Sequence, residues 1–286
     1  MCHPAMPADR AALASRPALI KVAVTEGALM PVALVAPDGG PATVDDTLGA
    51  GAGAGGSDAP TVVVVADIYG PSDFYLDLCA RLAARGLRAA LPDIFFRQGP
   101  LAERSFEAAV ARRAGLDESG ALGDLRALIA GLRDGRGGGG TDGGGGGASP
   151  TPVGVLGFCM GGTLALDLAA LEDALAVVAY YGFPVPQTTL VSPPPAPLDL
   201  APRMRGPVLA FWGDRDEAVG GENVSRFVEA MRTSPAEFEH RVYAGLGHAF
   251  LAQSQLPDEP AGDDDAGQSW QLTLRYFGRH LVPPQP

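Results

Sequence analysis

The chain has 286 residues, enough for one large or two small domains. Its formal net charge of -12 at pH 7 argues against nucleic acid or an anionic membrane as a partner, because both need basic patches. Hydrophobic residues make up 47% of the chain, and no apolar run approaches the ~20 residues of a membrane span. Its three widely spaced cysteines favour a reducing compartment, so we expect a cytoplasmic protein; the Ala-, Arg- and Ser-containing N-terminus makes an organellar location the alternative.

Low-complexity segments interrupt the sequence. We interpret residues 1–17 as a flexible N-terminal arm and residues 18–286 as a single domain. The stretches near 37–59 and 135–150 are rich in Gly, Ala, Asp and Pro, and they contain few side chains that could be buried. Such compositions predict flexible surface insertions rather than separate domains.

The first predicted elements of the domain form an antiparallel hairpin, with strands at 19–24 and 30–35. Strands and helices then alternate. The predicted strands cover residues 61–66, 87–91, 153–156, 175–181, 207–212 and 238–243, and the predicted helices begin near 72 and cover 101–132 with a break near 115, 163–171, 222–231 and 269–281. This order is typical of a mainly parallel sheet with helices on both faces, which binds ligands at the carboxyl ends of its strands.

The segment 157–162 follows one of these strands and has the pattern of a nucleophile elbow around Cys159. A nucleophile at the tip of so tight a turn needs small residues two positions before and after it, and Gly157 and Gly161 meet that need. The turn would place Cys159 at the positive end of the next helix and aim the N–H of Met160 at a developing oxyanion. The structural alternative is a small core cysteine beside a tight turn.

Two further strand ends carry groups that could assist a cysteine nucleophile. His248 lies in a glycine-rich turn after the strand at 238–243, from which it could reach the elbow; the structural alternative is a surface loop histidine. An imidazole base needs an orienting acceptor at its other nitrogen, and Asp214 and Asp216 both follow the preceding strand. Asp214 is the more typical turn residue, so Asp216 is the predicted orienter. The order nucleophile, acid, histidine is that of the α/β-hydrolases.

On these motifs the chain resembles the dienelactone hydrolase family, the cysteine members of the α/β-hydrolase fold, over about residues 19 to 281. The matching segments are 67–70, 90–93, 157–162, 179–182, 213–216 and 247–250. The resemblance implies Cys159 as nucleophile, His248 as base and Asp216 as its orienter. It also implies that the main-chain N–H groups of Ile68 and Met160 form the oxyanion hole.

Two positions depart from the family's pattern. Asp67 stands where the characterised hydrolases carry a glutamate that holds the cysteine in a resting state, and its side chain is one methylene shorter. Asp67 is therefore either a thiol-gating or substrate-binding carboxylate or a strand-end turn residue. Ala252 stands where those enzymes place an arginine that binds the substrate carboxylate, so Arg97 and Arg104 are candidate replacements.

The sequence thus predicts an ester or lactone hydrolase of the carboxymethylenebutenolidase type that acts through a Cys-Asp-His triad on a small-molecule substrate. We expect neither a metal nor an organic cofactor, because no Cys/His cluster has metal-ligand spacing and the poly-glycine run lacks the Lys-Ser/Thr of a phosphate loop. We expect the protein to be a monomer. The alternative is a non-catalytic binding protein with an α/β-hydrolase fold. In that case Cys159 would be an inert thiol, alkylated no faster than Cys2 and Cys79.

Overall fold

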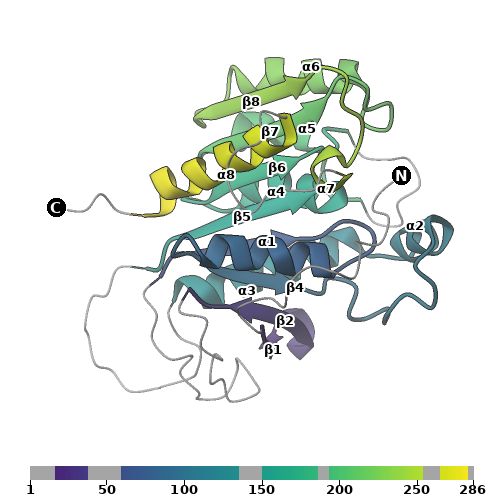
Figure 1. The fold of residues 1–286 in the computed structure, drawn as a ribbon, viewed down its shortest axis with the longest axis vertical. Helices are drawn as coiled ribbons and strands as arrows, with labels where there is room; N and C mark the ends of the chain where they lie inside the picture. The colour runs from purple at the N-terminus through teal and green to yellow at the C-terminus, as the bar shows by residue number, and fades with distance from the viewer. Residues whose placement is uncertain (1–16, 38–58, 135–149, 186–192, 254–264, 283–286) are drawn as a thin grey trace.

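The computed structural model describes residues 17–37, 59–134, 150–185, 193–253 and 265–282 (Figure 1). The N-terminal arm predicted at 1–17 and the insertions predicted near 37–59 and 135–150 lie outside these ranges except for their end residues. Part of the proline-rich segment between 184 and 202 also lies outside them.

The core of the fold is one mixed sheet of eight strands in the order β1-β2-β4-β3-β5-β6-β7-β8. The strands are β1 (Ala18–Ala23), β2 (Leu29–Val35), β3 (Thr61–Val65), β4 (Arg88–Pro92), β5 (Val153–Phe158), β6 (Ala176–Tyr180), β7 (Val208–Gly213) and β8 (Phe238–Tyr243). The β1–β2 and β2–β4 pairs are antiparallel, and the other five pairs are parallel. The predicted mainly parallel sheet with an N-terminal antiparallel hairpin is therefore confirmed.

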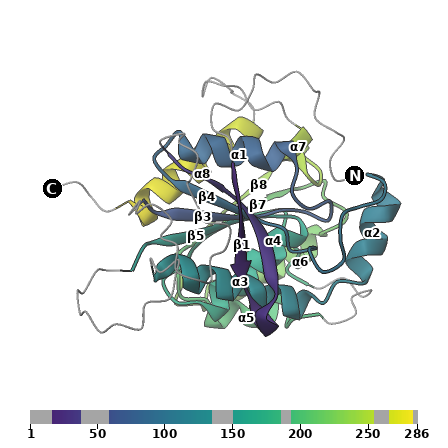
Figure 2. The same cartoon turned by 90° about the horizontal axis from the view of Figure 1, so that it is seen from below.

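Helices cover both faces of this sheet. They are α1 (Asp73–Ala83), α2 (Phe106–Ala114), α3 (Glu118–Arg133), α4 (Met160–Leu171), α5 (Pro197–Leu200), α6 (Gly221–Met231), α7 (Phe250–Gln253) and α8 (Asp265–Leu281), with short 3-10 turns η1 (Thr25–Gly27) and η2 (Ala201–Arg203). Figure 2 shows α1 and α8 on one face and α3, α4, α5 and α6 on the other. Every residue of the central strands β3, β5 and β6 is buried, because helices exclude water from both of their faces.

The predicted helical stretch at 101–132 is interrupted as expected, and its two halves have different roles. Ser105 caps α2 by accepting the N–H of Ala108 at 3.2 Å, and Asp117 caps α3 by accepting the N–H of Gly120 at 3.0 Å. Helix α3 packs on the sheet, whereas α2 lies beyond the end of the strands, as does α7, on the right of Figure 1. Since α2 follows β4 and α7 follows β8, this is the carboxyl edge of the parallel strands.

Candidate active site

Cys159 occupies the sharp turn between β5 and α4. Its backbone has φ 55° and ψ -118°, a left-handed conformation that is costly for a residue with a side chain. The surroundings hold this conformation in place, because its N–H donates to the carbonyl of Tyr180 at 3.0 Å and its own carbonyl accepts the N–H of Thr163 at 3.0 Å. The turn leaves Cys159 3% exposed at the N-terminus of α4, where the helix dipole favours negative charge.

The small residues around the cysteine are required by close backbone contacts. A Cβ atom on Gly157 would lie 2.1 Å from the carbonyl oxygen of Gly161, and a Cβ atom on Gly161 would lie 2.2 Å from that of Val65. A Cβ atom on Gly162 would lie 2.7 Å from the oxygen of Tyr180. The prediction that the residues two before and two after Cys159 must be small is therefore confirmed, and the second glycine of the pair has its own steric reason.

Asp216 and His248 meet after β7 and β8. The Nδ1 atom of His248 lies 2.8 Å from Oδ2 of Asp216, and the other carboxylate oxygen of Asp216 accepts the N–H of Val219 at 3.1 Å. Asp214, two residues earlier, is exposed and accepts the N–H of Gly245 at 2.7 Å. Asp214 therefore lies in a turn, whereas Asp216 lies against the imidazole of His248.

Aromatic packing connects the histidine to the nucleophile elbow. The ring of Tyr181 lies 5.0 Å from the ring of His248 and 6.2 Å from that of Phe158, the residue before Cys159. Phe183 lies 5.5 Å from His248. The backbone N–H of Phe183 donates at 2.9 Å to the hydroxyl of Thr163, which lies in the first turn of the helix that begins after Cys159. Tyr181 and Phe183 therefore each contact both the imidazole and a residue next to the elbow, at the carboxyl edge of the sheet.

The turn after β3 carries Asp67 and Ile68. Asp67 forms an Asx turn, in which its Oδ1 accepts the N–H of Tyr69 at 2.9 Å and its carbonyl accepts the N–H of Gly70 at 2.9 Å. The N–H of Ile68 is not a donor in either bond. The N–H of Met160, in the first residue of α4, has no acceptor within the helix. Both predicted oxyanion donors thus follow adjacent strands, β3 and β5.

Tyr75 of α1 lies beneath this turn. Its hydroxyl accepts the N–H of Asp67 at 3.2 Å, and its ring lies 5.3 Å from that of Phe158. Burial raises the pKa of Tyr75 well above its usual value, and the charges of Asp67 and Tyr181 add to that effect. Tyr75 therefore carries a neutral hydroxyl at neutral pH, which can donate a hydrogen bond.

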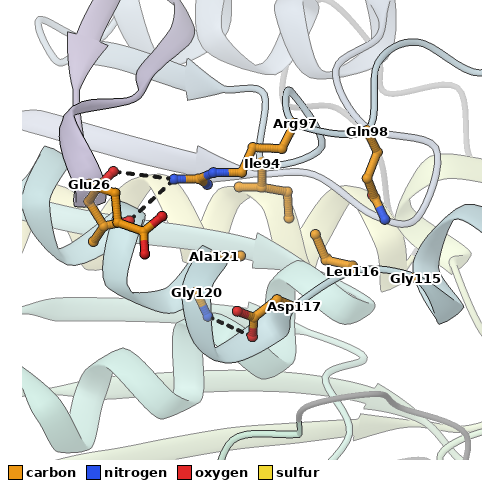
Figure 3. Close-up of a pocket in the computed structure, with 10 residues that line it drawn as sticks. Glu26, Ile94, Arg97, Gln98, Gly115, Leu116, Asp117, Gly120 and Ala121 are labelled. Atoms are coloured by element: carbon orange, nitrogen blue, oxygen red, sulfur yellow. Dashed lines mark hydrogen bonds between the residues drawn. The ribbon is translucent and has the colours of Figure 1, made fainter.

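Of the two arginines singled out in the sequence, Arg97 is engaged elsewhere. Its guanidinium pairs with Asp124, and one of its nitrogens contacts the hydroxyl of Thr25 at 3.3 Å. Arg97 lines a cavity of about 260 Å³, and Figure 3 shows Glu26 and Asp117 on other sides of the same cavity. None of the predicted catalytic residues lines this cavity. Arg97 is therefore committed to the hairpin turn and α3.

Arg104 and Arg112 are the arginines next to the Asp67–Gly70 turn. The guanidinium of Arg104 lies 5.8 Å from the centre of the Tyr69 ring, and that of Arg112 lies 3.9 Å from the centre of the Phe95 ring. Arg112 also donates to the carbonyl of Ile68 at 3.0 Å. Sequence analysis did not identify Arg112, because one arginine on a helix has no spacing that distinguishes it from a solvated charge.

Within the described ranges, no group of three or more His, Cys, Asp or Glu side chains is placed to hold a metal ion. Among the same residues, no helix has both the length and the apolar character needed to cross a bilayer.

The chain matches a known protein family along most of its length. A model of the dienelactone hydrolase family matches residues 49–281. Carboxymethylenebutenolidase of Rhodococcus opacus is 34% identical over 222 residues, which cover 78% of this chain and 82% of the relative. Carboxymethylenebutenolidase 2 of Cupriavidus pinatubonensis is 32% identical over 206 residues, which cover 72% of this chain and 79% of the relative.

Solved structures agree with these sequence matches. A crystal structure from Klebsiella pneumoniae subsp. pneumoniae, assigned as a dienelactone hydrolase, is 26% identical to this chain. It superposes with a TM-score of 0.70 and covers 93% of this chain and 100% of that one. The predicted α/β-hydrolase fold and the predicted family resemblance are therefore both confirmed.

Proposed function

Because the chain belongs to the dienelactone hydrolase family and is thus a hydrolase of ester bonds, we propose that it cleaves a small ester or lactone through a thioester on Cys159. Asp216 and His248 complete the triad in this proposal, and the N–H groups of Ile68 and Met160 form the oxyanion hole. The hydrogen bond between Asp216 and His248 carries the proposal most directly, since it fixes an imidazole at the edge of the sheet where the elbow lies.

The reaction divides into two half-reactions. In the first, the thiol of Cys159 gives its proton to His248, and the sulfur attacks the carbonyl carbon of the substrate. The negative charge that develops on the carbonyl oxygen is stabilised by the two N–H groups, each worth roughly 3 kcal/mol in the transition state. The tetrahedral intermediate collapses, the bond to the alcohol oxygen breaks, and the imidazolium of His248 protonates the leaving alkoxide.

The second half-reaction releases the acid. His248 removes a proton from water, the resulting hydroxide attacks the thioester carbon, and the carbon–sulfur bond breaks. The proton then returns to the sulfur of Cys159. Asp216 keeps the Nδ1–H tautomer of His248, so that Nε2 faces the reacting groups in both steps. The proposed reaction uses groups of one chain, and a monomer stays our prediction for the active unit.

The substrate class follows from the relatives and from the surroundings of the site. The relatives named above are carboxymethylenebutenolidases, which supports a small lactone or ester that carries a carboxylate. Ala252 leaves that carboxylate without the arginine that the family places four residues after the histidine. Because Arg97 is paired with Asp124, we propose that Arg104, exposed beside Tyr69, binds it instead.

Turnover of a substrate panel tests this proposal. The panel consists of p-nitrophenyl acetate, a simple lactone and dienelactone, each assayed with the wild type, Cys159→Ala and His248→Ala. The proposal requires that the wild type releases acid from at least one of them and that both variants lose this activity. Cys79 serves as the matched control because it is fully buried in α1 and burial raises the pKa of its thiol, so Cys79→Ala is expected to keep the wild-type rate.

A further inference from the structure

We propose that Arg112 and Asp67 together hold the peptide unit between Ile68 and Tyr69, and thereby act as positioning residues for the oxyanion hole. The inference rests on the proposed function, because it assigns these two side chains a role in the same reaction. In this arrangement Asp67 acts without contacting the thiol of Cys159. Arg112 acts by binding a backbone carbonyl and does not contact the substrate.

Two hydrogen bonds define this arrangement. The carbonyl oxygen of Ile68 accepts a hydrogen bond from Nη2 of Arg112 at 3.0 Å. The N–H of Tyr69 donates to Oδ1 of Asp67 at 2.9 Å. These two groups belong to one planar peptide unit, so side chains from α2 and from the turn itself fix it at both ends.

The preceding peptide, which carries the oxyanion donor, is fixed in turn. The N–H of Ile68 and the carbonyl of Asp67 belong to the same trans peptide and point in opposite directions. That carbonyl accepts the N–H of Gly70 at 2.9 Å, inside the turn, so the N–H of Ile68 points out of the turn. The hydroxyl of Tyr75 fixes the peptide before it by accepting the N–H of Asp67 at 3.2 Å.

Arg112 is itself held in position. Its guanidinium stacks 3.9 Å from the centre of the fully buried Phe95 ring, and Nη1 lies 3.4 Å from the carbonyl of Gly99. Gly70 has φ 72°, and a Cβ atom there would lie 3.3 Å from Nη2 of Arg112. The glycine thus leaves room for the arginine to reach Ile68. The guanidinium is a rigid link between α2 and the oxyanion turn.

The chemistry indicates which step depends on this link. An oxyanion develops only in the transition states of acyl transfer, so a misdirected Ile68 N–H should lower kcat and leave substrate affinity largely unchanged. Alkylation of Cys159 by iodoacetamide displaces iodide from carbon and forms no oxyanion. It therefore reports whether the cysteine and its surroundings are intact when the oxyanion hole is not used.

The experiment compares Arg112→Met, which keeps an unbranched apolar stem but removes the donor, with Asp67→Ala and Asp67→Asn. Asp67→Asn keeps an Oδ1 acceptor and loses the charge. For p-nitrophenyl acetate, kcat should fall about 10- to 100-fold in Arg112→Met and Asp67→Ala, with KM within about 2-fold of wild type. Asp67→Asn should recover most of the rate lost in Asp67→Ala. The matched control is Arg85→Met, at an exposed arginine beyond the end of α1.

Each variant is also alkylated with iodoacetamide across a pH series, and the plateau rate at high pH is compared. The proposal predicts wild-type plateau rates for Arg112→Met and Asp67→Ala. It is overturned if Arg112→Met keeps wild-type kcat, if acylation and alkylation fall together, or if Asp67→Asn is as slow as Asp67→Ala. Failure of the proposed function would look different, because the wild type would then not turn over or the turnover would survive Cys159→Ala.

Discussion

The imidazole of His248 shares a 2.8 Å hydrogen bond with Asp216, whereas Asp214, in the same turn after β7, binds the backbone of Gly245 at the surface. Two aspartates separated by one residue therefore have different environments. Asp216 is 4% exposed, and both of its oxygens are occupied within the protein. The difference makes the pair a matched test of which carboxylate orients the base.

Asp216→Asn should lower kcat by on the order of 10²- to 10⁴-fold, because an amide that donates to Nδ1 would favour the wrong imidazole tautomer. Asp214→Asn keeps an oxygen that can accept the N–H of Gly245, so its kcat should stay within about 2-fold of wild type. The measurement is steady-state hydrolysis of p-nitrophenyl acetate by both variants. Equal losses in the two variants would contradict the assignment of Asp216 as the orienter.

Gly161→Ala should prevent folding or lower the free energy of unfolding by at least about 3 kcal/mol, because its Cβ would lie 2.2 Å from the backbone oxygen of Val65. The matched control is Gly131→Ala, at an exposed position of α3 with no atom within 4 Å of the added Cβ. That variant should gain roughly 0.5–1 kcal/mol from the higher helix propensity of alanine. Urea unfolding measures both, and a Gly161→Ala variant as stable as wild type would show that the elbow is looser than described.

Asp167 predicts a pH dependence of stability. Burial within α4 raises its pKa well above the usual value, and the nearby charge of Glu118 raises it further. Its favourable contribution is therefore complete below about pH 4, the pKa of an unfolded aspartate, and is lost as the pH rises through the folded-state pKa. The stability of Asp167→Asn relative to wild type should accordingly increase as the pH is raised from 4 toward 7.

Urea unfolding of Asp167→Asn and wild type at several pH values tests this trend. Arg113 already has Glu118 as its carboxylate partner at 3.1 Å. Glu217→Gln, at an exposed carboxylate, is the control for the general loss of one negative charge. A stability difference between Asp167→Asn and wild type that stays constant with pH would rule out the buried, protonated carboxyl.

Substitution of Arg104 should affect substrate binding, whereas substitution of Arg97 should affect stability. Arg104→Gln should raise KM about 3- to 10-fold for an ester that carries a carboxylate and leave KM for a neutral ester unchanged, because an exposed ion pair is worth about 1 kcal/mol. Arg97→Gln should lower Tm instead, since it leaves the buried Asp124 with fewer partners. A selective KM effect in Arg97→Gln, or none in Arg104→Gln, would show that the substrate carboxylate binds elsewhere.

Much of this architecture could be read from local sequence patterns. The run 61–66 predicts a strand buried on both faces, and Gly157 and Gly161 around Cys159 predict the elbow, because steric limits at a tight turn act over a few residues. The helix break near Gly115 is also predicted from a local signal, because glycine favours the end of a helix. Such features depend on neighbours in the chain, and the structure confirms them.

Other features depend on contacts between distant segments. Arg112 reaches Ile68 across 44 positions, and no periodicity in the sequence encodes that contact. The sequence allows Asp67 to be either a functional carboxylate or a turn residue, and its Asx turn depends on a side-chain rotamer that the sequence does not specify. Helices α5 and α7 have four residues each, too few for a helical pattern to stand out. Local sequence patterns therefore point to candidate triad residues, but they do not point to contacts of this kind.

The most direct test of the account is to trap the acyl enzyme. The wild type is mixed with p-nitrophenyl acetate, quenched in acid within the first turnover, digested and analysed by mass spectrometry. The account predicts one acetyl group, carried as a thioester by the peptide that contains Cys159, and no such adduct or turnover in Cys159→Ala. Acid release by Cys159→Ala at the wild-type rate, or an acetyl group located only on another residue, would contradict it.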